Sequence, residues 1–167
     1  VRLPNSTKHY DQSMRYGIDK KTANQQVKIF NESGCVGFIP AYKDAVEYVN
    51  KLHALEWRFE VVSCLDKDKY AQKLRAKNLL HLFGDVFDFI DCGLDYSIGK
   101  EQYLLDRYKG KSYYWIEDSV SHAISGKNVG LKSIIMDHEY NKEWKGVRVK
   151  NWKEVYRLLV MKFHYQQ

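Results

Sequence analysis

The chain has 167 residues, a formal net charge of +6 and a hydrophobic content of 44%. This length and composition suit one globular domain with a sizeable core, and they exclude a low-complexity or repeat protein. No apolar run approaches the ~20 residues of a membrane span and no charged-then-apolar signal peptide opens the chain, so we expect a cytoplasmic protein without a membrane partner. The three cysteines have no metal-binding spacing and are expected to be ordinary buried thiols.

The first half of the chain changes from a polar start to a clear alternation of elements. Residues 1–34 are polar and tyrosine-bearing, with a thin apolar pattern that supports one helix. In chain order the pattern predicts a helix at 20–30, a helix at 41–55, a strand at 59–63, a helix at 67–82 and a strand at 86–92. Glycines 34 and 84 are expected to end two of these helices.

The second half continues the alternation. The pattern predicts a helix at 101–108, a strand at 113–116, a helix at 120–128 and a strand at 132–136. Strands that alternate with helices favour right-handed crossovers and a mainly parallel sheet with helices on both faces. The expected fold class is therefore α/β and Rossmann-like.

Polar side chains stand where the predicted strands end. Ser63 ends one strand, Glu117 and Asp118 end another, and Lys100 begins a helix that leads into the second of these. In parallel sheets ligands bind beyond the carboxyl ends of the strands, so all four can converge on one rim. A carboxylate pair can hold Mg²⁺, which prefers oxygen ligands and retains water and phosphate oxygens. The serine hydroxyl and the lysine ammonium could then bind a phosphate.

Each of these residues also has a plain structural interpretation. Glu117 and Asp118 could simply begin the following helix, where acids interact favourably with the helix dipole. Ser63 could be an ordinary strand-end serine, and Lys100 a solvated surface lysine. The net positive charge suits a phosphate-bearing partner or a merely solvated surface, since the lysines are spread along the chain.

Taken together, the motifs resemble those of a known superfamily. The segments VVS (61–63), GK (99–100) and WIEDS (115–119), followed by Gly130, resemble the second, third and fourth motifs of the haloacid dehalogenase-like (HAD) hydrolases. The segments IPAYKDAVEYV (39–49), DHEYN (137–141) and VKNWKEV (149–155) are most similar to the 5′(3′)-deoxyribonucleotidase type. The resemblance covers roughly residues 38–159.

The resemblance implies a fold and a division of labour. It implies a three-layer HAD-like sandwich, with a small helical cap at 1–34 and the α/β core at 35–167. Asp118 and Glu117 would hold Mg²⁺, and either could be the direct ligand. Ser63 and Cys64 would bind the phosphoryl group, and Lys100 would neutralise charge on the phosphate and on the attacking carboxylate.

One expected motif is absent. The first HAD motif is a strand ending in Asp-x-Asp that supplies the nucleophile and the acid–base, and no such strand precedes residue 61. GIDKKT (17–22) has a single aspartate, DVFD (85–88) has the wrong spacing, and DKD (66–68) comes after the second motif. Because the chain opens with Val1, the first strand is expected to lie outside the sequence; alternatively it is naturally missing, or another chain supplies it.

The expected function is Mg²⁺-dependent hydrolysis of nucleoside monophosphates, or of other small phosphate esters, through an aspartyl-phosphate. Tyr10, Tyr16 and Phe30 could stack on a base, although in a small helical unit such residues more often form the core. His138 and Asn141 could border the pocket mouth or belong to an ordinary loop. Two alternatives stay open: a non-catalytic module that binds phosphate or nucleic acid, for which the 13 tyrosines suit stacking, and a polynucleotide end phosphatase.

Overall fold

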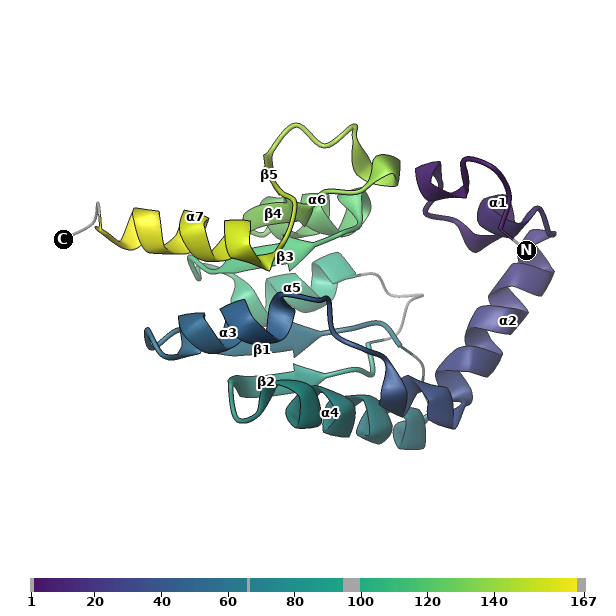
Figure 1. Cartoon of the computed structure of the whole chain (residues 1–167), viewed down its shortest axis with the longest axis horizontal. Coiled ribbons are helices and arrows are strands. Elements are labelled where there is room, and N and C mark those ends of the chain that lie inside the picture. Colours follow the sequence, from purple (N-terminus) through teal and green to yellow (C-terminus); the bar gives the residue numbers. More distant parts are fainter. Residues whose placement is uncertain (1, 66, 95–99, 165–167) are drawn as a thin grey trace. The chain divides into compact units, whose positions relative to one another are not determined.

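The protein is described by a computed structural model that covers residues 2–65, 67–94 and 100–164, with side chains up to residue 161. The chain forms two compact units (Figure 1): unit 1 comprises residues 1–27 and 97–150, and unit 2 comprises residues 28–96 and 151–167. The described ranges contain seven α-helices and two parallel sheets, of two and three strands. The predicted α/β class is therefore confirmed.

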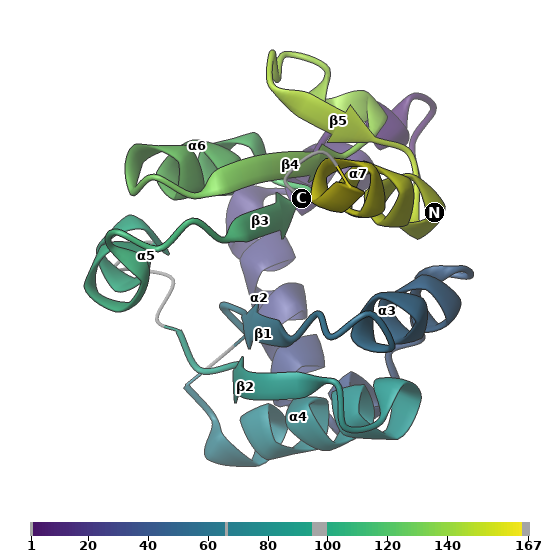
Figure 2. The same ribbon diagram turned by 90° about the vertical axis from the view of Figure 1, so that its left-hand side faces the viewer.

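Unit 2 contains the smaller sheet. Strands β1 (Phe59–Val62) and β2 (Phe87–Asp91) pair in parallel, and helix α4 (Lys69–Phe83) connects them and lies along the sheet (Figure 2). Asp68 caps the N-terminus of α4: its carboxylate accepts a hydrogen bond of 2.8 Å from the Tyr70 amide. It ends at Gly84, where a φ of 76° favours glycine.

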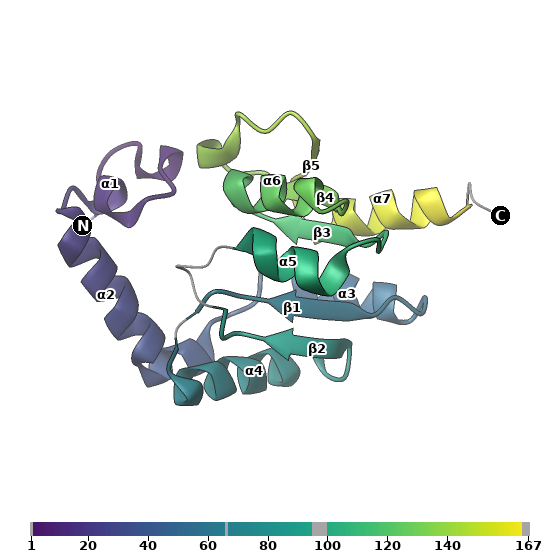
Figure 3. The same cartoon turned by 180° about the vertical axis from the view of Figure 1, so that it is seen from behind.

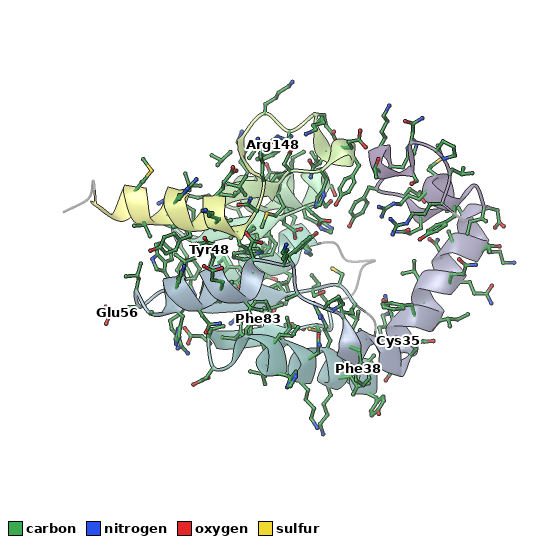
Figure 4. The ribbon with its side chains drawn as sticks, in the orientation of Figure 1. Cys35, Phe38, Tyr48, Glu56, Phe83 and Arg148 are labelled. Carbon is green, nitrogen blue, oxygen red and sulfur yellow. The ribbon has the colours of Figure 1, made fainter. Side chains whose placement is uncertain are left out.

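Two further helices complete the core of unit 2. Helices α3 (Ala45–His53) and α7 (Trp152–His164) pack against each other, with Leu52 and Val155 fully buried. The 3₁₀ helix η2 (Gly34–Phe38) packs on α4, but the Phe38 side chain is 84% exposed (Figure 4). Cys35 in η2 is also exposed and only Cys92 is buried, so the expectation of three buried thiols was wrong.

Unit 1 contains the larger sheet, with the strand order β3 (Tyr114–Glu117), β4 (Lys132–Met136) and β5 (Val147–Val149). Helix α5 (Lys100–Tyr108) precedes β3, and helix α6 (Val120–Asn128) connects β3 to β4 and packs on both strands (Figure 3). Ile134 and Ile135 are buried on the central strand. At Gly126 of α6 a β-carbon would lie 2.3 Å from the Trp115 ring, so only glycine lets the helix approach β3 this closely.

The N-terminal part of unit 1 is helical. It consists of η1 (Ser6–Lys8), α1 (Gln12–Tyr16) and the start of α2 (Lys20–Glu32), and η1 packs on a 3₁₀ helix after β4, η3 (Glu139–Asn141). Within α2 only Ala23 is buried. Tyr10, Tyr16 and Phe30 are 37–47% exposed, so the interpretation of these aromatic residues as a small core was wrong.

The predicted elements agree well with the structure. All nine are present; 120–128 and 132–136 match residue for residue, while α3 begins four residues later than predicted. Helices α1 and α7 and strand β5 were not predicted. Gly99 of the third motif and Asp66 of the DKD segment lie outside the described residues. The division into a cap at 1–34 and a core at 35–167 stays a prediction.

The strands form two sheets instead of one. Within the described ranges β1 pairs only with β2, and β3 pairs only with β4, so each has one edge without a strand partner. None of the helices in the same ranges combines the length and apolar character that a membrane crossing requires.

Candidate functional site

The carboxyl ends of β3 and β4 frame the candidate site in unit 1. The two strands are parallel, with Glu117 opposite Ile135, so Asp118 and Asp137 both follow the carboxyl ends of their strands, on the same side of the sheet. Ligands bind beyond the carboxyl ends of the strands in parallel α/β sheets. Lys100, the first residue of α5, also reaches this end of the sheet, because it forms an ion pair with Glu117.

Lys100 and Glu117 form a buried ion pair. The Lys100 Nζ lies 2.5 Å from Glu117 Oε1, and the two side chains are only 7% and 9% exposed. His122, in the first turn of α6, places Nδ1 3.6 Å from the same oxygen, and Lys100 Nζ lies 5.3 Å from the centroid of the Trp115 ring. Two buried charges are tolerated because each has a partner. The interpretation of Lys100 as a solvated surface lysine was therefore wrong.

The surroundings of Glu117 fix its charge state. Burial by itself would raise the pKa of this carboxyl, but the interactions with His122 and with the positive charge of Lys100 outweigh it, so the pKa lies below its ordinary value. Glu117 is consequently ionised at neutral pH and holds the Lys100 ammonium at the end of β3.

Asp118 is half-buried and points toward a different set of groups. Its Oδ2 accepts a hydrogen bond of 2.7 Å from the Tyr140 hydroxyl. Its backbone carbonyl accepts one of 2.8 Å from the Asn141 amide, which also donates at 2.8 Å to the carbonyl of Met136. Asn141 is fully buried, so it joins the loop after β3 to the loop after β4. It does not border a pocket mouth, and that interpretation was wrong.

Asp137, after β4, already has two cationic partners. Lys142 Nζ lies 2.8 Å from both of its oxygens. Arg148, whose place on β5 is labelled in Figure 4, puts Nη1 2.6 Å from Oδ1. The hydrogen bond from Lys142 has the largest effect on the pKa of this carboxyl and lowers it; burial opposes this, and the hydrogen bond from Arg148 lowers the pKa further, so it lies below its ordinary value. Asp118 is thus the carboxylate at this edge that is not ion-paired with a described residue.

Ser63 and Cys64 lie at the corresponding edge of the other sheet. The Ser63 amide donates to the Asp91 carbonyl at 2.8 Å, and Cys64 forms an isolated bridge with Gly93, just beyond β2. Both residues belong to unit 2, whereas Lys100, Glu117 and Asp118 belong to unit 1. The structure therefore brings together three of the five predicted site residues and does not place the other two relative to them.

Asp118 is the residue of this site that could hold a metal ion. No cluster of three or more His, Cys, Asp or Glu side chains suited to a metal ion occurs among the residues that the structure covers. Mg²⁺ needs no such cluster, because it is commonly held by one or two carboxylates together with waters and substrate oxygens. Asp118 at a strand end, next to an ionised Glu117, fits this simpler arrangement.

Three residues that contact the carboxylates at this end of the sheet were missed. His122 lies one helical turn beyond Asp118 in sequence, and this spacing was a usable signal. Tyr140 and Arg148 carry no comparable signal, because their contacts with Asp118 and Asp137 arise only when β4 and β5 pair and η3 folds back. No protein-family profile matches the chain, and no curated protein shows significant similarity to it.

Proposed function

We propose that the chain is the greater part of a Mg²⁺-dependent phosphohydrolase of the HAD type, most similar to the 5′(3′)-deoxyribonucleotidases and acting in the cytoplasm on nucleoside monophosphates. The proposal is supported by one observation above all. Lys100, Glu117 and Asp118, selected from two separate motifs, converge at the carboxyl end of β3, and two of them form a buried ion pair.

The contacts suggest distinct roles for the three residues. Glu117 positions the Lys100 ammonium, because its carboxylate is taken up by that ion pair and by His122. Lys100 binds an oxygen of the substrate phosphate as a compact positive charge. Asp118 is the direct Mg²⁺ ligand, oriented by the Tyr140 hydroxyl. When bound, Mg²⁺ would neutralise negative charge on the phosphate oxygens.

The remaining parts of the site come from elsewhere. Ser63 and Cys64, after β1, bind the phosphoryl oxygens through hydroxyl and backbone groups. The nucleophile belongs to an Asp-x-Asp strand outside residues 1–167. Strand β3 has one edge that pairs with no described strand, and a parallel strand added there would end beside Lys100 and Asp118.

The reaction proceeds in two displacements. The first aspartate of the Asp-x-Asp strand attacks phosphorus, and the bond from phosphorus to the nucleoside oxygen breaks as the second aspartate gives that oxygen a proton. Water then attacks the aspartyl-phosphate and passes its proton to the second aspartate. The bond to the first aspartate breaks, and inorganic phosphate leaves. Lys100 offsets the charge of the phosphate oxygens in both steps.

The decisive experiment compares two lengths of the protein. Residues 1–167, and a version extended upstream through an Asp-x-Asp strand, are assayed against 5′- and 3′-deoxynucleotides with Mg²⁺ and with EDTA. We expect Mg²⁺-dependent phosphate release by the extended chain only. In the extended chain Lys100→Ala should lower the rate about a hundredfold or more, because it removes a charge that stabilises the transition state. Lys109→Ala, at an exposed lysine just beyond the same helix, serves as the matched control.

Two results would contradict the proposal. Metal-dependent turnover by residues 1–167 would mean that the nucleophile lies within them. Inactivity of the extended chain, with phosphate binding retained, would favour the non-catalytic module.

A further inference from the structure

A cavity of about 350 Å³ lies within unit 1, beside the loop that follows β4. Its lining combines Thr7 and Arg15 of the N-terminal segment with residues 137–140 and Lys142 of that loop, and so includes the acids Asp137 and Glu139. Tyr140 links the cavity to the candidate site, because the same side chain lines the cavity and donates its hydroxyl hydrogen to Asp118. A ligand in the cavity would therefore lie next to the carboxylate proposed to bind Mg²⁺.

Arg15 is the unexplained group in this cavity. Its backbone is held firmly, since its amide donates to the Asp11 carbonyl at 3.1 Å and its carbonyl accepts from the Leu3 amide at 3.0 Å. The Nε atom of its guanidinium is buried and has no hydrogen-bond partner. Among the residues that the structure covers, the Arg15 side chain also has no carboxylate within ion-pair distance. A buried donor atom of a charged group costs free energy when it has no acceptor, so this nitrogen calls for an acceptor from outside the chain.

The acids around Arg15 are already engaged. Asp137 accepts from Lys142 and from Arg148 at 2.6–2.8 Å, and Glu139 accepts a hydrogen bond from the Thr7 hydroxyl. The charged residues that line the cavity are two cations, Arg15 and Lys142, and two acids, Asp137 and Glu139. Lys142 is paired with Asp137, so among the described residues Arg15 is the lining cation that has no acid partner. Arginine presents a planar fork of donors that matches the oxygens of phosphate.

Aromatic rings form the wall next to these charges. The His138 ring stacks on Tyr140, with ring centroids 4.9 Å apart and planes 14° from parallel. The Tyr10 ring meets Tyr140 edge-on at 5.4 Å and is 47% exposed. Flat rings beside a free guanidinium suit a ligand that combines a planar base with an anionic group.

We infer that the cavity is an oxyanion subsite in which Arg15 binds a phosphate other than the one that is hydrolysed. The protein then prefers ligands with two phosphates, which can be supplied by a nucleoside 3′,5′-bisphosphate or by the end of an oligonucleotide. The preference for a second phosphate rests on the proposed function, whereas the oxyanion subsite at Arg15 stands on the cavity alone.

Calorimetric titration of the whole chain in Mg²⁺ tests the inference. The probes are thymidine 5′-monophosphate, thymidine 3′,5′-bisphosphate and the 5′-phosphorylated dinucleotide of thymidine. We expect at least one of the two-phosphate probes to bind about tenfold or more tightly than the monophosphate, as one charge-assisted contact implies. Tighter binding of the bisphosphate than of the dinucleotide would identify a free nucleotide as the ligand, and the reverse order would identify an oligonucleotide end.

Variants assign the effect to Arg15. Arg15→Gln should abolish the advantage of the second phosphate, and Arg15→Lys should restore part of it. Lys20→Gln, at a lysine that is 76% exposed in the same N-terminal segment, should leave the advantage intact. Circular dichroism establishes that each variant is folded. Equal affinity for all three probes in the unchanged chain, or an advantage that persists in Arg15→Gln, would overturn the inference.

The two proposals can fail separately. Asp118→Asn and Lys100→Gln should weaken binding of the monophosphate while the ratio between two-phosphate and one-phosphate ligands stays dependent on Arg15. An Arg15-dependent phosphate affinity that is indifferent to Mg²⁺, Asp118 and Lys100 supports the subsite and contradicts the proposed function. Mg²⁺-dependent binding that does not change when Arg15 is replaced supports the proposed function and contradicts the subsite.

Discussion

Asp118 and Asp137 show that two aspartates at the same edge of a sheet can have opposite availability. Asp137 is held by Lys142 and Arg148, whereas Asp118 accepts only neutral donors from described side chains, such as the Tyr140 hydroxyl. A cation that arrives from solution has to compete with an existing ion pair at Asp137 but not at Asp118. The availability of a carboxylate therefore depends on its partners as well as on its position.

The difference between Asp118 and Asp137 predicts where Mg²⁺ binds. Asp118→Asn should weaken Mg²⁺ binding by at least about tenfold, because a neutral amide replaces the anionic ligand, while the Tyr140 hydrogen bond can be kept by the amide oxygen. Isothermal calorimetry of residues 1–167 measures the affinity. Asp137→Asn is the matched control and should change it little. Equal affinities for the unchanged chain and Asp118→Asn would remove the metal site from this edge.

The second prediction concerns the buried pair. Glu117→Gln should lower the free energy of unfolding by about 3–5 kcal/mol, because it leaves the Lys100 ammonium buried without its counter-charge. The double variant Lys100→Met, Glu117→Leu should recover much of that loss. Glu47→Gln breaks an ion pair in which both side chains are more than half exposed, and should cost less than about 1 kcal/mol. Urea unfolding measures all three, and equal losses at Glu117 and Glu47 would mean that the burial of the first pair has no energetic consequence.

The same pair predicts a pH dependence. The pKa of Glu117 is lower in the folded protein than its unfolded value of about 4.3. The stabilisation that the charged carboxylate gives is therefore complete above that unfolded value, and it is lost as the pH falls through the folded pKa. Glu117→Gln should unfold with a weaker pH dependence in this acidic range, in the same urea experiment repeated from pH 7 to 3.

Only some of the site residues could be predicted from the sequence. Lys100, Glu117 and Asp118 could be selected together because their types and spacing resemble known motifs. Their partners could not, since Tyr140 and Arg148 reach Asp118 and Asp137 through the fold of β4, η3 and β5 and not through any local pattern. The burial of Lys100 could not be predicted either, because a lysine at the start of a helix gives the same sequence pattern whether its side chain is solvated or, as here, only 7% exposed.

The contact between α6 and β3 depends on a glycine, Gly126, which has no side chain at the point of closest approach. Gly126 lies at the point where the helix crosses the Trp115 ring and the Ser133 hydroxyl, at 2.3 and 2.9 Å from the position of an added β-carbon. Glycine normally weakens a helix by about 1 kcal/mol relative to alanine. Here the close approach offsets that cost, since it lets α6, the helix that carries His122, pack on β3 and β4.

The close contact at Gly126 predicts the effect of adding a side chain there. Gly126→Ala should destabilise the protein by about 1–3 kcal/mol, because overpacking against Trp115 outweighs the gain in helix propensity. Lys127→Ala, at the exposed neighbouring position, should stay within about 0.5 kcal/mol of the unchanged chain. Thermal unfolding followed by tryptophan fluorescence measures both. Stabilisation by Gly126→Ala would show that the Trp115 ring moves aside without cost.

The elements themselves were largely predictable, and the exceptions have physical reasons. Strand β5 has only three residues, Val147–Val149, and its first valine is 42% exposed, so it lacks the length and alternation that mark a strand. Helix α7 did carry a signal, because Val155 and Leu159 are buried four residues apart, but the segment around it was interpreted only through its resemblance to a motif.

For the whole molecule, the pairing of strands was the main thing that the sequence did not determine. Apolar periodicity identifies a strand but not its neighbour, because parallel pairing joins segments that are separated by a whole helix. One sheet was expected, and sheets of two and three strands are present. The same limit applies to the site: Ser63 and Cys64 follow β1 in unit 2, whereas Lys100 belongs to unit 1, so their joint role stays a prediction.

Asn141 has a consequence for how the protein ages. Its buried amide makes four hydrogen bonds: two donated to the carbonyls of Asp118 and Met136, and two accepted from the His138 amide and Arg148. All of its hydrogen-bonding capacity is used. Deamidation, the slow hydrolytic loss of ammonia from asparagine, would replace both donors by an anion that faces two carbonyl oxygens. A single such event in a stored sample would separate the loops after β3 and β4 and disturb Asp118 without changing the length of the chain.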